Sequence, residues 1–350
     1  MDTAHSLGKR WMGGALPAVH SAGTRAHRTT TARRLGLFLQ RKERMASCAT
    51  AAAAATPGGV GPTVARATRL VASLIKEYSG RNPTAERAIR VLSDQTKDSV
   101  SWDHLAFRTW GHQRNCIATL SPIFASLGYE KKGELEFTQK RLRAQWYAPA
   151  DAAAYEVLPR IFISELKLEE QSEEVRAIVS KYCESLPADG ELADEEMMCG
   201  KALPWKAPVL KDDFEYLAKE SGEYAAWVLT NGYALNHTTV SAHRLGDGYT
   251  MERMVEMLEA NGFAMNDSGG VIKVSADGGL RQSSTVADNK DFVFAGDVQE
   301  KVPGSYIEFA ERLPQPGKDA KATRECDLRD GFETASADRI FESTTLSQAR

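Results

Sequence analysis

Two segments of this 350-residue chain show the same order of sequence patterns, and each begins with a strand-like stretch that carries histidine. The first stretch is His104–Trp110 and the second is His237–Arg244. Each precedes an amphipathic helical pattern and then three short strand-like segments. Both units therefore have the predicted order β-α-β-β-β, which indicates a duplicated module. Paired copies can form one curved sheet with a cavity between them, so we predict an α+β fold.

Apolar periodicity and helix-ending residues locate the remaining elements of both units. Gly128 ends the first helix, since glycine readily adopts the left-handed conformation found after many helices, and Gly262 occupies the matching place. In the first unit we expect a helix at Cys116–Leu127 and strands at Tyr129–Phe137, Leu142–Tyr147 and Arg160–Leu166. In the second we expect a helix at Met251–Asn261 and strands at Val271–Val274, Leu280–Val286 and Ser305–Arg312.

Helical patterns lie before and between the two modules. Thr63–Ser93 has helical periodicity, and Pro83 is suited to begin a second helix inside it. An acidic insertion has helical patterns near Glu173–Glu184 and Asp212–Leu229. We therefore divide the chain into a leader at 1–55, N-terminal helices and first module at 63–167, a helical insertion at 168–230, and the second module with a C-terminal segment at 231–347.

The leader has the composition of an organellar transit peptide. Residues 1–50 carry nine lysine or arginine residues against two acidic ones, and an alanine run follows at 51–55. Richness in serine, threonine and alanine favours a plastid over a mitochondrion; the alternative is a disordered tail with no targeting role. No stretch is long and apolar enough for a membrane span.

Charge and cysteine content narrow the class of protein further. The net charge is −3, and the basic leader leaves about −10 on residues 51–350, which argues against a nucleic-acid-binding surface. The five cysteines show neither metal-knuckle nor redox spacing. Free thiols in a reducing compartment are the simpler interpretation.

Strand parity sorts the four histidines outside the leader. Side chains two residues apart on a strand share a face. His104 therefore shares a face with Arg108, and His237 shares one with His243. His112 and His243 lie near strand ends, so we expect supporting or surface roles for both.

Glu308 is the third residue that this pattern singles out. It lies between Ile307 and Phe309, and a carboxylate is costly to bury unless it is paired or bound to a metal. Two imidazoles and a carboxylate leave three open positions on an octahedral Fe(II), enough for a chelating 2-oxo acid and O₂. Arg108 could bind a substrate carboxylate through two hydrogen bonds. Spacing alone also allows structural histidines and a solvated glutamate, and it leaves Glu165 open as a ligand or a solvated strand end.

Three motifs carry a family resemblance: Asp103–Arg108, Asn236–Thr239 and Tyr306–Arg312, with a weaker match at Phe332–Phe341. They resemble the 2-oxoadipate dioxygenase/decarboxylases, also called 2-hydroxyglutarate synthases. The resemblance spans roughly residues 65–347, implies a fold like that of the vicinal-oxygen-chelate superfamily, and is nearest to the plant plastid branch. It implies Fe(II) held by His104, His237 and Glu308, with Arg108 and Ser336 contacting substrate.

The implied reaction converts 2-oxoadipate and O₂ into 2-hydroxyglutarate and CO₂, a step of lysine breakdown. The expected partners are a small 2-oxo dicarboxylate and O₂, with no nucleic acid or membrane. A second cation is needed for the distal carboxylate, and Arg141, Arg143 and Arg312 remain unranked candidates. Two alternatives stay open: a glyoxalase-like or extradiol-like metalloenzyme, and a non-enzymatic plastid protein acting in starch or plastid development.

Overall fold

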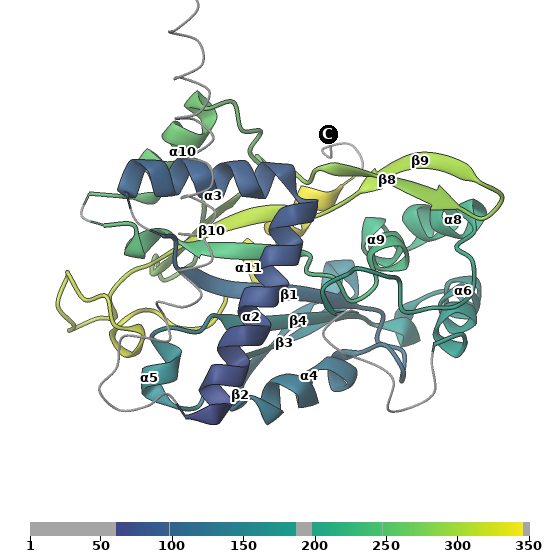
Figure 1. Ribbon diagram of the computed structural model, residues 1–350, viewed down its shortest axis with the longest axis horizontal. Coiled ribbons are helices and arrows are strands. Elements are labelled where there is room, and N and C mark those ends of the chain that lie inside the picture. Colours follow the sequence, from purple (N-terminus) through teal and green to yellow (C-terminus); the bar gives the residue numbers. More distant parts are fainter. Residues whose placement is uncertain (1–60, 98, 187–197, 247, 346–350) are drawn as a thin grey trace, which may run out of the picture. The chain divides into compact units, whose positions relative to one another are not determined.

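An eight-stranded mixed sheet organises the part of the chain that the structure describes (Figure 1). The structure is a computed structural model, described here for residues 61–97, 99–186, 198–246 and 248–345; the expected leader lies outside these ranges. Its strands occur in the order β2 (Tyr129–Phe137), β3 (Leu142–Pro149), β4 (Arg160–Leu166), β1 (Trp102–Thr109), β5 (His237–Ser241), β10 (Tyr306–Arg312), β7 (Leu280–Ser284) and β6 (Lys273–Val274).

Strand pairing confirms the predicted duplication. In the first module β1 is parallel to β4, which is antiparallel to β3, which is antiparallel to β2. In the second module β5 is parallel to β10, and β10, β7 and β6 then alternate in direction. The two copies meet at the antiparallel β1–β5 pair in the middle of the sheet. The first strands of the two modules are therefore direct neighbours.

One face of the sheet packs against helices to form the larger apolar core. Leu105, Phe107 and Ile307 lie on this face and are buried with residues of α2 (Pro62–Arg81), α3 (Pro83–Thr96), α4 (Ile117–Ser126) and α10 (Met251–Ala260). The side chain of Asn82 accepts a hydrogen bond from Ala85 N and caps α3, one residue before Pro83. The predicted helix start at Pro83 is thus confirmed.

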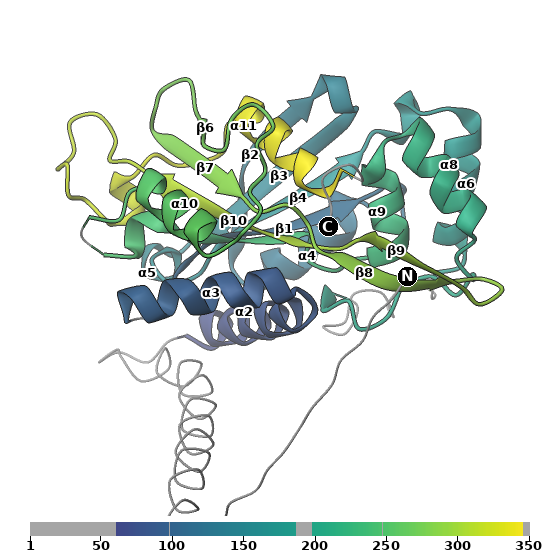
Figure 2. The ribbon, with the colours of Figure 1, turned by 90° about the horizontal axis from the view of Figure 1, so that it is seen from above.

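The opposite face of the sheet carries polar side chains and is covered by α11 (Thr334–Ile340) and the 3₁₀ turn η5 (Phe341–Thr344). Figure 2 shows α11 across the sheet from α2 and α3. The insertion adds α6 (Glu173–Glu184), α8 (Lys211–Glu220) and α9 (Glu223–Asn231). The single helix expected at Asp212–Leu229 is wrong, because Gly222, at φ 70°, separates α8 from α9.

Two further differences from the expected elements concern the second module. A hairpin of β8 (Asn289–Phe294) and β9 (Val298–Pro303) lies between β7 and β10 and was not predicted. Strand β5 ends at Ser241, and the 3₁₀ turn η3 (Ala242–Arg244) follows. His243 therefore does not share a strand face with His237.

The remaining short elements connect these layers. They are α5 (Ala152–Tyr155) and the 3₁₀ turns η1 (Thr138–Lys140), η2 (Leu168–Glu170) and η4 (Glu325–Asp327). Among the described residues, no helix combines the length and apolar character needed to cross a bilayer.

Candidate metal centre

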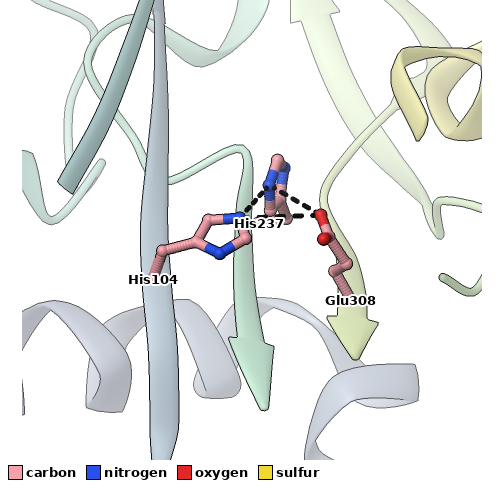
Figure 3. A group of neighbouring side chains, drawn as sticks. All are labelled: His104, His237 and Glu308. Carbon is pink, nitrogen blue, oxygen red and sulfur yellow. Dashed lines mark hydrogen bonds and ion pairs between the residues drawn. The ribbon is translucent and has the colours of Figure 1, made fainter. Parts of the chain in front are cut away.

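His104, His237 and Glu308 converge on the polar face of the sheet (Figure 3). They come from β1, β5 and β10, three consecutive strands of the sheet. His104 and Glu308 are both paired in register with Thr239, one from each side of β5. Neighbouring strands bring residues in register onto the same face, so this pairing places the three side chains together. The three residues that the sequence singled out therefore form one cluster.

The ligand-type atoms of the cluster lie within 4.8 Å of one another and are shielded from solvent. Glu308 Oε2 lies 3.1 Å from His237 Nε2 and 3.7 Å from His104 Nε2. The two Nε2 atoms are 3.4 Å apart. His104, His237 and Glu308 are 2%, 4% and 1% exposed, respectively. Bulk water therefore does not screen the interactions among the three side chains.

Outer partners fix which imidazole nitrogens face the cluster. His104 Nδ1 lies 2.8 Å from Asp103 Oδ1, and His237 Nδ1 lies 2.9 Å from Asn236 Oδ1. Both oxygens are acceptors, so each Nδ1 donates and each neutral ring presents an Nε2 lone pair inward.

Gln282 Nε2 donates to Glu308 Oε1 at 2.7 Å, which leaves Oε2 facing the imidazoles. Thr239 Oγ1 also lies 3.0 Å from His104 Nε2. Three electron-pair donors thus meet at one point, two nitrogen and one oxygen. This donor set fits a divalent transition metal, whose charge relieves the repulsion among the lone pairs.

Charge and burial set the protonation of the cluster. Burial lowers the pKa of His237 to about 4, although Glu308 opposes this. Burial alone would raise the pKa of Glu308, but His104 and His237 hold it at about 2. For His104, burial lowers the pKa, and the Glu308 charge together with the Asp103 hydrogen bond outweighs burial and raises it. An ionised carboxylate and a neutral His237 are the forms that bind metals.

Arg108 lies on the same face as His104 and is 1% exposed. Its Nη1 donates to Thr344 Oγ1 at 3.0 Å, whereas Nε and Nη2 have no hydrogen-bond partner. The rings of Tyr224, Trp227 and Phe341 surround the guanidinium at 4.9, 5.4 and 5.4 Å. Within the described ranges no carboxylate forms an ion pair with it. A buried cation without an anion is a site for one.

A cavity of about 20 Å³ lies beside the three-residue cluster, under α11. Ala337, Ile340 and Phe341 line it from one side, and Phe162 and Phe332 add apolar walls. This volume is enough for about one water molecule, so a six-carbon diacid can enter only if α11 and η5 shift. Ser336 is buried on α11, next to Ala337.

The three arginines considered for a second carboxylate have different environments. Arg312 is buried and bound to Asp103, and Arg143 pairs with Glu165 and Glu169. Arg141 is exposed and lines a second cavity of about 340 Å³. Tyr224 and Phe341, the rings that flank Arg108, also line that cavity.

Glu165 is neither a solvated strand end nor part of the cluster. Its Oε2 accepts a hydrogen bond from Ile117 N at 2.7 Å, at the first residue of α4, and Oε1 accepts from Arg143 Nε at 2.5 Å. It is thus a buried helix-terminus acceptor. Register also shows that the counterpart of Glu308 is not Glu165 but Phe162. His104 pairs with Arg160 two residues before Phe162, just as His237 pairs with Tyr306 two residues before Glu308.

The other two histidines lie outside the cluster. His112 Nδ1 accepts from Arg114 N in a turn. His243 Nδ1 accepts from Arg312 N at 3.2 Å, so His243 supports an arginine that binds Asp103. Sequence reasoning missed Asp103, Asn236 and Gln282 as partners of the cluster. Asp103 and Asn236 each directly precede a histidine at the start of a repeat, and that shared placement was the available signal.

Comparison with known proteins places these residues in a family context. The family described as 2-oxoadipate dioxygenase/decarboxylase matches residues 61–320. The rice chloroplastic/amyloplastic 2-oxoadipate dioxygenase/decarboxylase is 41% identical over 88% of this chain and 87% of its own length. The chloroplastic Arabidopsis thaliana protein of the same name is 44% identical over 77% of this chain and 75% of its own length.

A crystal structure of rice hydroxyglutarate synthase in complex with 2-oxoadipate is also similar to this chain. The two share 40% sequence identity with a TM-score of 0.78, over 83% of this chain and 95% of the rice chain. The similarity therefore covers both modules and the strands that carry the cluster.

Proposed function

Because this chain belongs to the 2-oxoadipate dioxygenase/decarboxylase family, we propose that it converts 2-oxoadipate and O₂ into 2-hydroxyglutarate and CO₂. The observation that carries this proposal is the pairing of two features on one sheet face. One is the convergent His104, His237 and Glu308 set, and the other is the buried Arg108 with two free N–H groups. A metal site beside an anion site suits a 2-oxo acid.

We assign Fe²⁺ to the three-residue cluster. Two imidazoles and one carboxylate on one side of a metal are typical of non-haem iron oxygenases, because the other positions stay open. A ferrous ion bound there would supply the redox chemistry with O₂ and a positive charge for the 2-oxo acid.

The chain's own residues bind and orient the substrate. Arg108 binds a carboxylate through Nε and Nη2, and Asp103 and Asn236 hold the imidazoles in one tautomer. Phe162, Phe332 and Ile340 exclude water from the reacting end of the substrate. Ser336, on the helix that covers the cavity, is assigned to the substrate side as well.

The names of the relatives and the composition of the N-terminal residues suggest where the protein acts. Relatives named chloroplastic support a plastid protein, in which the basic residues 1–55 serve as a transit peptide. The step belongs to lysine breakdown. N-terminal sequencing of the protein purified from plastids should find a start well past Met1, and an intact Met1 contradicts cleavage.

Anaerobic loading with Fe²⁺, followed by addition of 2-oxoadipate and O₂, tests the reaction. We expect O₂ consumption and the release of equal amounts of CO₂ and 2-hydroxyglutarate. Protein loaded with Zn²⁺ is the control, since zinc has no redox chemistry. No CO₂ from 2-oxoadipate, with turnover of a glyoxalase-type or catechol substrate instead, would favour the related metalloenzyme alternative. Neither metal binding nor turnover would favour a non-enzymatic protein.

A further inference from the structure

Tyr306 carries a buried hydroxyl without a partner, directly beside the candidate metal centre. The residue is fully buried, and its Oη makes no hydrogen bond. Its ring stacks on His237, with centroids 4.6 Å apart and planes at 27°. Leaving a buried hydroxyl unpaired is costly. This placement indicates that the hydroxyl forms its hydrogen bond with a bound ligand.

The groups around Tyr306 identify the chemistry of that partner. The Arg108 guanidinium lies close enough to the Tyr306 hydroxyl to interact with it. Arg108 Nε and Nη2 are also unpaired. The two guanidinium N–H groups can only donate, and the hydroxyl has one hydrogen to donate. A single group that pairs with all three must therefore accept several hydrogen bonds.

The free atoms of Arg108 have the geometry for one carboxylate. Nε and Nη2 lie on the same edge of the planar guanidinium, and that edge binds a carboxylate through two parallel hydrogen bonds. Nη1 can keep its bond to Thr344. A carboxylate bound in this way still has lone pairs for a further donor.

We propose that Tyr306 is a substrate-positioning residue, whose hydroxyl donates a hydrogen bond to the same substrate carboxylate that Arg108 binds. This inference rests on the proposed function. Ile340 packs on Tyr306 and Phe341 packs on Arg108, so the segment Ile340–Phe341 covers both groups. Its displacement by the entering diacid exposes the three donors together.

Tyr306→Phe tests the proposal, because it removes the unpaired hydroxyl and keeps the ring on His237. We expect affinity for 2-oxoadipate, measured anaerobically by calorimetry on Fe²⁺-loaded protein, to fall about 10- to 100-fold. KM should rise in parallel. The midpoint of unfolding should not fall, since no hydrogen bond within the protein is lost, and bound metal should stay at the wild-type ratio.

Tyr129→Phe is the matched control. Tyr129 is also buried, but its hydroxyl donates to the Pro159 carbonyl oxygen at 3.0 Å on the other face of the sheet. We expect this variant to unfold at a lower temperature and to keep the wild-type affinity for 2-oxoadipate.

The outcomes separate this inference from the function it rests on. Wild-type turnover of 2-oxoadipate with an unchanged dissociation constant and KM in Tyr306→Phe overturns the Tyr306 contact alone. Loss of metal together with loss of affinity also overturns it, because the hydroxyl would then support the metal centre and not the substrate. A wild-type protein that neither binds nor converts 2-oxoadipate overturns both proposals.

Discussion

Arg312 binds the Asp103 carboxylate through both of its oxygens, from Nε at 2.6 Å and from Nη2 at 2.9 Å. The same carboxylate accepts the hydrogen bond from His104 Nδ1. Arg312 therefore supports His104 indirectly, and the Arg312 and Arg160 charges, working against burial, hold the pKa of Asp103 well below its usual range. A negative partner on Nδ1 keeps the His104 ring in one orientation.

Asp103→Asn should therefore weaken metal binding and stability together. We expect metal affinity to fall about 10- to 100-fold, as for other outer-shell changes. The buried Arg312 loses its carboxylate, which costs about 3–5 kcal/mol of the free energy of unfolding. Chelator competition and urea denaturation measure the two effects. Asp277→Asn is the control, because it breaks an ion pair with Arg329 outside the cluster; it should change metal affinity and stability little. Wild-type metal affinity in Asp103→Asn would refute the view that Asp103 supports His104.

Removing a member of the cluster should remove the metal. His104→Ala and Glu308→Ala should each bind far less than one metal ion per chain, measured by elemental analysis after dialysis. Glu165→Gln is the matched control, a buried glutamate that binds Ile117 N and Arg143 instead. It should keep the metal and lose about 1–3 kcal/mol of stability. Full metal occupancy in both alanine variants is the result that rejects the ligand assignment.

Arg108→Met should separate stability from function. A buried guanidinium with two unpaired N–H groups is unfavourable in the free protein, so an apolar replacement should leave the unfolding midpoint unchanged or raise it. KM for 2-oxoadipate should rise at least about 30-fold, because the substrate carboxylate then lacks its cation. Thermal unfolding and steady-state kinetics test the two halves. A destabilised variant with normal KM would show that Arg108 is structural.

Lys290 gives a pH dependence that is independent of the metal centre. Burial, reinforced by the Arg81 charge, lowers its pKa to about 7, and Nζ donates to Thr230 O. Because the folded pKa lies below the unfolded value, the unfolded state binds more protons between these two pH values. This residue therefore makes stability rise as the pH increases from about 7 to about 10.

Lys290→Met should remove that rise. At pH 6–7 we expect the variant to be more stable than the wild type by roughly 1–3 kcal/mol, the cost of a buried polar group that is poorly compensated. The difference should shrink as the pH approaches 10. Denaturation curves at three pH values measure it, and a constant difference across this range contradicts the lowered pKa.

Local patterns predicted most of the sheet and singled out the three cluster residues, but only the family resemblance favoured a shared metal site over separate structural roles. Glu308 stands out because Ile307 and Phe309 are buried in the core, and period-two alternation then assigns it to the opposite face. Pro83 and Gly128 mark helix ends through backbone preferences that depend on one residue each. The β8–β9 hairpin lacked such a signal, because its apolar residues do not alternate with polar ones: Phe292, Val293 and Phe294 are consecutive in β8, and Glu300 and Lys301 are adjacent in β9.

Contacts between distant residues could not be predicted in the same way. Asp103 and Arg312 lie 209 positions apart, and neither has a sequence neighbour that points to the other. The unpaired state of Arg108 and Tyr306 depends on what every nearby element leaves unfilled, so it appears only when all side chains are placed. The role of Glu165 could not be decided from the sequence for the same reason. Only the pairing of β4 with β1 shows that Phe162, and not Glu165, corresponds to Glu308.

Phe162 in the first repeat occupies the strand position that Glu308 occupies in the second. The two repeats therefore match at their histidines but differ at the position of the acid. Each copy contributes one imidazole from its first strand, but only the second contributes a carboxylate. The Phe162 ring instead lines the cavity, so the first repeat supplies one ligand-type side chain and an apolar wall, and the second supplies two ligand-type side chains. A phenylalanine at this one position of the first repeat therefore makes one side of the cluster apolar, while the other side stays polar.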